Sequence, residues 1–165
     1  MPEFFDLMDR PLADLSIEDL YITVGEAFGQ HRFAQYTTAF DQDQTFYWEA
    51  MGGDYREFAP RLRQTLDNMS AALSNFHVYY APGSMHCITI YPFFDTREVN
   101  GVKFKDWLSQ LVQGQTPPES VQCEGEGCFN DPVCDACAEN DEGPGCGFCR
   151  DWPDRYLPDA SPPQE

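Results

Sequence analysis

A histidine and an aspartate each follow a predicted strand, and these two residues, Asp41 and His86, could do chemistry together. The run of residues 76–80 alternates in polarity with a period of two, which indicates a strand. Pro82-Gly83 ends it, because proline lacks an N–H group and glycine allows a positive φ. His86 is therefore expected on a loop just past a strand, where a general base can face a cleft. A surface histidine with no catalytic role is the alternative at this point.

Asp41 follows a second predicted strand, the aromatic and β-branched run of residues 33–40. Sites in open α/β sheets gather outside the carboxyl ends of strands, so we expect Asp41 and His86 to meet there. A carboxylate beside a histidine fixes the tautomer of the ring and stabilises the imidazolium, as in Ser-His-Asp hydrolases. Asp43 is a second candidate acid. Turn formation, in which aspartate is favoured, is the alternative explanation for both aspartates.

The sequence offers this pair no nucleophile. A Gly-x-Ser-x-Gly elbow occurs nowhere in it. Ser84 lies only two residues before His86, too close to stand on a strand-to-helix turn of its own, and Gly52-Gly53 follows no predicted strand. The order of acid and then histidine is that of α/β-hydrolases, in which the nucleophile precedes both. On this chain alone, acyl transfer would have a base and an orienting acid with nothing to activate.

The other predicted elements form the scaffold for these two loops. Helices are expected over residues 16–28, 54–74 and 105–112, one or two helical turns over 45–51, and a hairpin over 96–104 around Asn100-Gly101. The order helix–strand–helix–strand–helix is the doubly wound α/β pattern. Two or three strands are fewer than such a sheet usually has, which indicates that part of the sheet lies upstream. From residue 115 the sequence is rich in Pro, Gly, Asp, Glu and Cys and predicts an irregular tail.

Length and charge narrow the class of protein. The 165 residues suffice for one domain with one core, and the net charge of −18 comes from 28 acidic and 10 basic residues. This charge disfavours nucleic acid and anionic membranes as partners. No apolar run approaches the length of a membrane-spanning helix, so no membrane span is expected. The first residues also lack the basic and apolar regions of a signal peptide.

Three segments resemble the pectin acetylesterase and Notum family of α/β-hydrolases. Residues 32–46 look like the family's acid-bearing segment, and residues 80–87 resemble its histidine loop. Residues 98–112 resemble the closing hairpin and helix of its bacterial members. The three motifs stand in the family's order, which makes a chance likeness improbable. The predicted units are therefore 1–114, the C-terminal portion of an α/β-hydrolase domain, and the acidic, Cys-rich tail 115–165.

The resemblance implies that Asp41 is the triad acid and His86 the triad base of a serine carboxylesterase, with no cofactor. Family members act on acetyl or acyl esters of polysaccharides, or on a lipid ester of a protein, in a secreted or cell-surface setting. We therefore expect an extracellular or periplasmic parent enzyme whose substrate is an acetylated polysaccharide or another acyl ester. Because the elbow, the oxyanion loop and the first strands are missing, we expect this chain to be inactive alone. The alternative is a standalone, non-enzymatic protein with a Cys-rich interaction or zinc-binding module.

Six of the seven cysteines fall between Cys123 and Cys149. The pairs Cys134-x-x-Cys137 and Cys146-x-x-Cys149 could form two zinc knuckles. Against a metal site, no histidine lies nearby and the spacer between the pairs is short. We predict disulfides, because a secreted parent would oxidise these cysteines. Cys87 is the odd thiol, expected to pair with a cysteine outside this chain or to stay buried beside the site.

Overall fold

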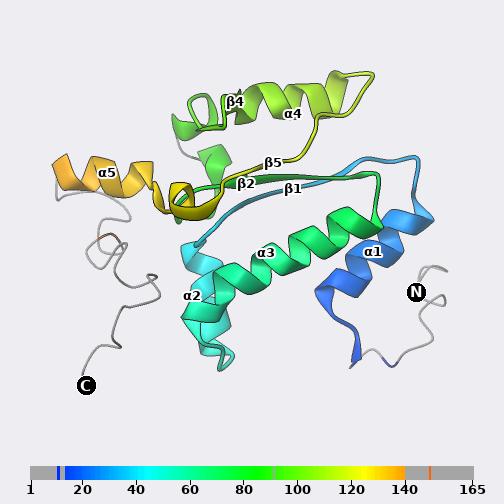
Figure 1. Ribbon diagram of the computed structural model, residues 1–165, viewed down its shortest axis with the longest axis horizontal. Helices are drawn as coiled ribbons and strands as arrows, with labels where there is room; N and C mark the ends of the chain where they lie inside the picture. Colours follow the sequence, from blue (N-terminus) through cyan, green and yellow to red (C-terminus); the bar gives the residue numbers. More distant parts are fainter. Residues whose placement is uncertain (1–10, 12–13, 91, 140–148, 150–165) are drawn as a thin grey trace.

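Strand β2 (Phe76–Ala81) is the centre of the fold, and all six of its side chains are buried. In this computed structural model, which describes residues 11, 14–90, 92–139 and 149, β2 lies between two other strands that both run parallel to it. β1 (Phe33–Thr38) pairs with β2 along its whole length, and the short β5 (Val121–Gln122) pairs on the other side. The sheet order is therefore β1-β2-β5 (Figure 1).

Helices α1 (Ile17–Ala27), α2 (Gln42–Ala50) and α3 (Tyr55–Ala72) lie on one side of this sheet (Figure 1). Tyr21 of α1 meets Phe76 of β2 edge to face, with ring centroids 6.3 Å apart. Leu66 and Met69 of α3 are buried together with Leu73, which ends that helix. The helices predicted over 16–28 and 54–74 are thus present. The apolar stripe of α3 is buried against the sheet, whereas α1 packs less closely: Gly25 is its one buried residue, and Ile17 and Tyr21 are exposed.

The other face is covered by the hairpin β3 (Glu98–Val99) and β4 (Val102–Lys103) and by α4 (Phe104–Gln113). Asn100 and Gly101 have φ values of 52° and 81°, which is the conformation that a two-residue type I′ turn requires. Tyr79 of β2 contacts the rings of Phe104 and Trp107 at centroid distances of 5.1 and 5.5 Å. The hairpin and helix predicted here are therefore confirmed, and they bury the second face of β2.

Burial on both faces is typical of a central strand in a parallel sheet. It also affects His77, which is 7% exposed and points to the same face as Tyr79. Burial lowers the pKa of His77 below its ordinary value, and a hydrogen bond with the backbone of Pro118 opposes this shift only in part. Nε2 of His77 has no hydrogen-bond partner within the described residues. His77 is therefore a buried, neutral histidine of the core.

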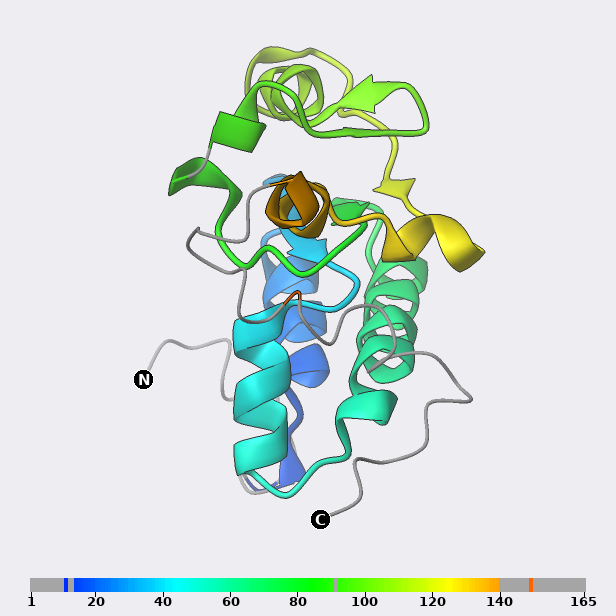
Figure 2. The same cartoon turned by 90° about the vertical axis from the view of Figure 1, so that its left-hand side faces the viewer.

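The prediction of an irregular tail is wrong for its described part. Beyond β5, the chain forms a 3-10 turn, η5 (Gly125–Phe129), and the helix α5 (Pro132–Glu139). β5 is only two residues long and carries no periodic pattern, so its strand conformation follows from the edge that β2 offers it. Figure 2 shows η5 and α5 beside the segments that follow β1 and β2. The tail therefore contributes one strand, β5, to the sheet.

The disulfides predicted for the tail are present. Cys123 is bonded to Cys128, Cys134 is bonded to Cys149, and Cys137 is also disulfide-bonded. Cys146 lies outside the described residues. No cluster of three or more His, Cys, Asp or Glu side chains that could hold a metal ion occurs in the described part of the chain. No helix among the described residues has the length and apolarity needed to cross a membrane.

Candidate functional site

Asp41 and His86 meet at the carboxyl ends of β1 and β2. Nδ1 of His86 lies 2.9 Å from each of the two carboxylate oxygens of Asp41. The Asp41 side chain is 1% exposed, whereas that of His86 is 40% exposed. An ionised carboxylate only accepts hydrogen bonds, so Nδ1 carries the hydrogen and Nε2 keeps a lone pair for another proton. Nε2 makes no hydrogen bond with any described residue, and a histidine oriented by a buried carboxylate has the geometry that general-base catalysis requires.

Asp41 is the N-cap of α2 and directly precedes the helix. The carboxylate accepts a hydrogen bond from the Gln44 backbone N–H at 2.9 Å, and the Gln44 side-chain amide donates to its other oxygen at 2.9 Å. These contacts hold the carboxylate of Asp41 in one orientation toward His86. Asp43, the alternative acid, lies exposed in the first turn of α2. No described contact joins Asp43 to His86, so the geometry favours Asp41.

Backbone hydrogen bonds continue the pairing of β1 and β2 into the two loops. The N–H groups of Ala39, Phe40 and Gln42 donate to the carbonyls of the facing segment at 2.9, 3.0 and 3.0 Å. The three acceptors belong, in order, to Ala81, Gly83 and Ser84. The loop that carries Asp41 and the loop that carries His86 are therefore fastened to each other, which fixes the distance between the two side chains.

Side chains hold the remaining carbonyls of the histidine loop. The hydroxyl of Thr38 donates to the Met85 carbonyl at 3.2 Å, where both groups are buried. The guanidinium of Arg97, which is 4% exposed, donates to the Pro82 carbonyl at 3.3 Å. A loop whose carbonyls are satisfied in this way is pre-organised, so the fold itself orders the segment that carries His86.

The described end of the tail also contacts the histidine loop. The N–H of Gly83 donates to the Cys128 carbonyl at 2.9 Å. The backbone N–H and the hydroxyl of Ser84 both donate to one carboxylate oxygen of Asp131, at 2.8 and 2.5 Å. Ser84 is 2% exposed and its hydroxyl is held by Asp131, so Ser84 is not a nucleophile available to His86.

The buried hydroxyl of Tyr36 lies close to three charged side chains, those of Arg97, Asp41 and Asp131. Burial raises the pKa of Tyr36 to about 12, against a smaller opposing effect of the Arg97 guanidinium. The carboxylates of Asp41 and Asp131 raise the pKa further, so the phenol lies within the electrostatic field of all three charged groups. Tyr36 is therefore a neutral hydroxyl at any pH at which the protein would function.

Two hollows lie near these elements, and neither is lined by Asp41 or His86. The larger, about 540 Å³, borders β5 and is lined by residues that include Arg63 of α3, Asn100 of the hairpin turn and Gln122. The smaller, about 260 Å³, borders the histidine loop at Pro82 and Arg97. The exposed side of His86 is therefore not enclosed by either of these hollows.

Sequence reasoning brought Asp41 and His86 together but missed the residues that hold them. Gln44 was accessible to such reasoning, because Asp-x-x-Gln is a spacing typical of helix N-termini. The role of Asp131 could not be predicted from the sequence, because Asp131 lies 47 residues after Ser84 in a segment without periodicity. The predicted alternatives for Cys87 can also be compared with the structure: its thiol is free and exposed, so it is not buried beside the site.

Comparison of the chain with models of protein families, with curated proteins and with solved structures found no match.

Proposed function

We propose that this chain carries the base and the acid of a serine carboxylesterase, with His86 as the base and Asp41 as the residue that orients it. The observation that carries the proposal is the contact of His86 Nδ1 with both carboxylate oxygens of the buried Asp41 at 2.9 Å. This contact leaves Nε2 to take a proton from a serine hydroxyl and later to return it to the leaving group. The resemblance to the pectin acetylesterase and Notum family supports the same assignment.

The nucleophile comes, in this proposal, from a segment outside this sequence. No Gly-x-Ser-x-Gly elbow is present, and Ser84 is committed to Asp131. Phe33 of β1 donates its backbone N–H to Asn75, which directly precedes β2. Backbone groups alternate between the two sides of a strand, so those of Ala34 and Tyr36 lie on the side away from β2, where no described strand pairs with β1. That free edge of β1 is where a larger doubly wound sheet would continue, and the elbow would stand at the carboxyl end of such a strand.

The family resemblance suggests the substrate class. The disulfides suggest the cellular location of the parent enzyme. We propose an acetylated polysaccharide, or another acyl ester, as the substrate of the complete enzyme. Disulfides such as Cys123–Cys128 persist in oxidising compartments, which favours an extracellular or periplasmic location.

The test compares this chain with a protein that contains a nucleophile. The upstream reading frame is searched for an in-frame Gly-x-Ser-x-Gly segment, and the extended protein is assayed for acetate release from acetylated pectin and for p-nitrophenyl acetate hydrolysis. The 165-residue chain alone is expected to show only background hydrolysis. The extended protein is expected to be active, and Asp41→Asn is expected to lower its kcat roughly 10³- to 10⁴-fold by disturbing the histidine tautomer.

Asp43→Asn is the matched control, because it makes the same chemical change two residues away on the exposed first turn of α2. It is expected to leave kcat within about twofold of the unsubstituted enzyme, as surface substitutions usually do. The opposite ranking of the two variants would move the acid assignment to Asp43. Undiminished activity of the extended protein after His86→Ala would refute the assignment of the base.

A further inference from the structure

Asp131 is bonded to the histidine loop, although it has no direct role in the proposed reaction. Its carboxylate is 1% exposed, and one of its oxygens accepts from both the N–H and the hydroxyl of Ser84. Hydrogen bonds to an ionised acceptor are stronger than those between neutral groups, most of all where water is excluded. Ser84 lies two residues before His86, so these two bonds fix the backbone immediately ahead of the histidine.

Gly83 of the histidine loop leaves room for the side chain of Asp131. Gly83 has a φ of 85°, and a Cβ atom placed on it would lie 2.8 Å from Cγ of Asp131 and 3.1 Å from its Cα. Only a glycine permits both this backbone conformation and this close approach. The Pro-Gly turn therefore ends β2 and also makes room for a side chain that arrives from the tail.

Ser84 is also bonded to the segment that carries Asp41. The carbonyl of Ser84 accepts from the N–H of Gln42, the residue that directly follows Asp41. Asp131 therefore binds one side of Ser84, while the segment that carries Asp41 binds the other. If Ser84 shifted, the distance from His86 to Asp41 would change, because both loops are attached to this one residue.

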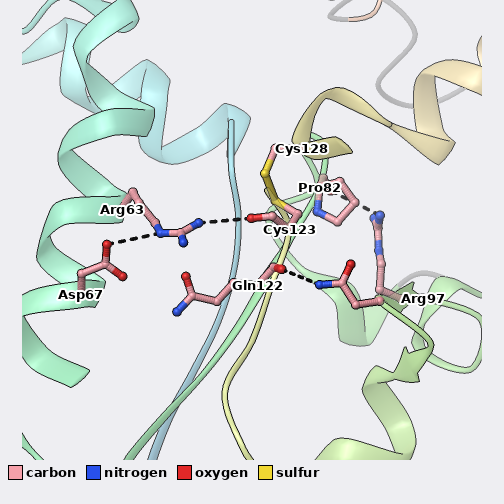
Figure 3. Close-up of a disulfide and its surroundings, with 8 residues drawn as sticks. Arg63, Asp67, Pro82, Arg97, Gln122, Cys123 and Cys128 are labelled. Atoms are coloured by element: carbon pink, nitrogen blue, oxygen red, sulfur yellow. Dashed lines mark hydrogen bonds and ion pairs between the residues drawn. A yellow bond between two sulfur atoms is a disulfide. The ribbon is translucent and has the colours of Figure 1, made fainter. Parts of the chain in front are cut away.

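Asp131 follows a segment that is closed by the Cys123–Cys128 disulfide. Figure 3 shows this disulfide and the contact of Arg63 with the carbonyl of Cys123. Cys123 is bonded to Cys128, its N–H donates to the Tyr80 carbonyl at 2.9 Å, and its own carbonyl accepts from Nη1 of Arg63 at 3.1 Å. Two residues before Asp131, Phe129 stacks on Phe40 at a centroid distance of 4.7 Å. The segment is thus anchored to β2, to α3 and to the loop that carries Asp41.

We propose that Asp131 is a positioning residue for His86, that it acts through Ser84, and that the Cys123–Cys128 segment is part of the site. The inference rests on the proposed function in that it takes His86 as the base. In this inference, the acidic tail holds the histidine loop in the conformation in which His86 contacts Asp41. Asp131 touches neither the ester nor the reacting atoms, so its loss affects the reaction only through the placement of His86.

The test measures the loop directly on this chain, with its disulfides intact. Amide hydrogen exchange reports the bond from the Ser84 N–H, and the ¹⁵N shifts of the imidazole report the His86 tautomer. Asp131→Ala is expected to speed exchange at Ser84 roughly 10- to 100-fold. The His86 ring is expected to change from a single Nδ1–H tautomer to a mixture. Asp131→Asn keeps one oxygen as an acceptor, so it is expected to restore most of both signals.

Asp135→Ala is the matched control, because Asp135 is an exposed carboxylate in the first turn of α5, the helix that begins directly after Asp131, and is expected to change neither signal. If Asp131→Ala does not fold, Ser84→Ala replaces it. That variant removes only the hydroxyl donor and is expected to give a smaller mixture of tautomers. Ser84 exchange and a His86 tautomer equal to those of Asp135→Ala in every folded variant would overturn the proposal.

The same variants in the extended, active protein separate this inference from the proposed function. Asp131→Ala is expected to lower kcat by roughly 10²-fold with little change in KM, as a displacement of about 1 Å of a catalytic group does. An inactive extended protein would refute the proposed esterase activity. The exchange and tautomer signals of the 165-residue chain would still decide whether Asp131 positions His86.

Discussion

Gly83 offers the sharpest test of how the tail and the histidine loop fit together. Gly83→Ala introduces two costs. The first is the left-handed backbone at φ 85°, which costs an alanine roughly 1–2 kcal/mol relative to glycine. The second is the collision of the new Cβ with Asp131, whose Cγ and Cα would be 2.8 and 3.1 Å away. Because one of these atoms belongs to the backbone, the contact is not relieved by a side-chain rotation, and overpacking of this kind costs about 1–3 kcal/mol.

Gly101→Ala separates the two costs. Gly101 has nearly the same φ, 81°, but a Cβ placed on it would meet no atom within 4 Å. It therefore carries the backbone cost alone, partly offset by the lower entropy of the unfolded chain, and is expected to destabilise by about 1 kcal/mol. Gly83→Ala is expected to destabilise by about 2–4 kcal/mol, a large share of the stability of a small domain.

The assay is urea unfolding of the oxidised protein, with the denaturant slope required to stay constant across the variants. The expected result is a free energy of unfolding for Gly83→Ala that lies at least 1 kcal/mol below that of Gly101→Ala, within the overpacking range. Equal destabilisation by the two substitutions would refute the close fit between Gly83 and Asp131.

Two further predictions concern the scaffold. Arg32→Ala removes three hydrogen bonds of 2.7–2.9 Å from the guanidinium to carbonyls at the end of α4, and is expected to lower the free energy of unfolding by about 1–2 kcal/mol. Arg61→Ala, which breaks an exposed ion pair with Glu57 and a cation–π contact 5.4 Å from the centroid of the Trp48 ring, is expected to cost under about 1 kcal/mol in the same urea titration. Burial lowers the pKa of His77, so the folded protein binds fewer protons here than the unfolded chain, and stability falls as pH drops below about 6.5. His77→Gln is expected to reduce the loss of stability between pH 7.5 and 5.5; an unchanged loss would count against the buried, neutral histidine.

Much of the scaffold could be predicted from the sequence because its signals are local. The stripe of Leu66 and Met69 repeats with the period of a helix, and Asn100-Gly101 has the residue types that a type I′ turn needs. The meeting of Asp41 and His86 could also be predicted, since it needs only two neighbouring parallel strands and the rule that loops at their carboxyl ends converge.

The features that could not be predicted from the sequence, β5 and the role of Asp131, depend on contacts between segments far apart in the chain. Val121 and Gln122 form a strand because β2 has an edge to pair with, and two residues are too few to show a period. Asp131 resembles the many other acidic residues of the tail until the fold places it against Ser84. The role of the tail was therefore hidden by its composition, which is that of a linker, although its described part packs against the sheet.

The 47-residue separation between Ser84 and Asp131 has a consequence for the order of events during synthesis. At the usual 5–20 residues per second, the ribosome adds Asp131 roughly 2–10 s after Ser84. Throughout that interval β1, α3 and β2 can form, but β2 has an open edge and the loop of His86 has no carboxylate to hold it. The two hydrogen bonds from Ser84 to Asp131 therefore form only after the tail has been made, so a ribosome-bound chain that ends before Asp131 would carry Asp41 and His86 on their two loops without these bonds.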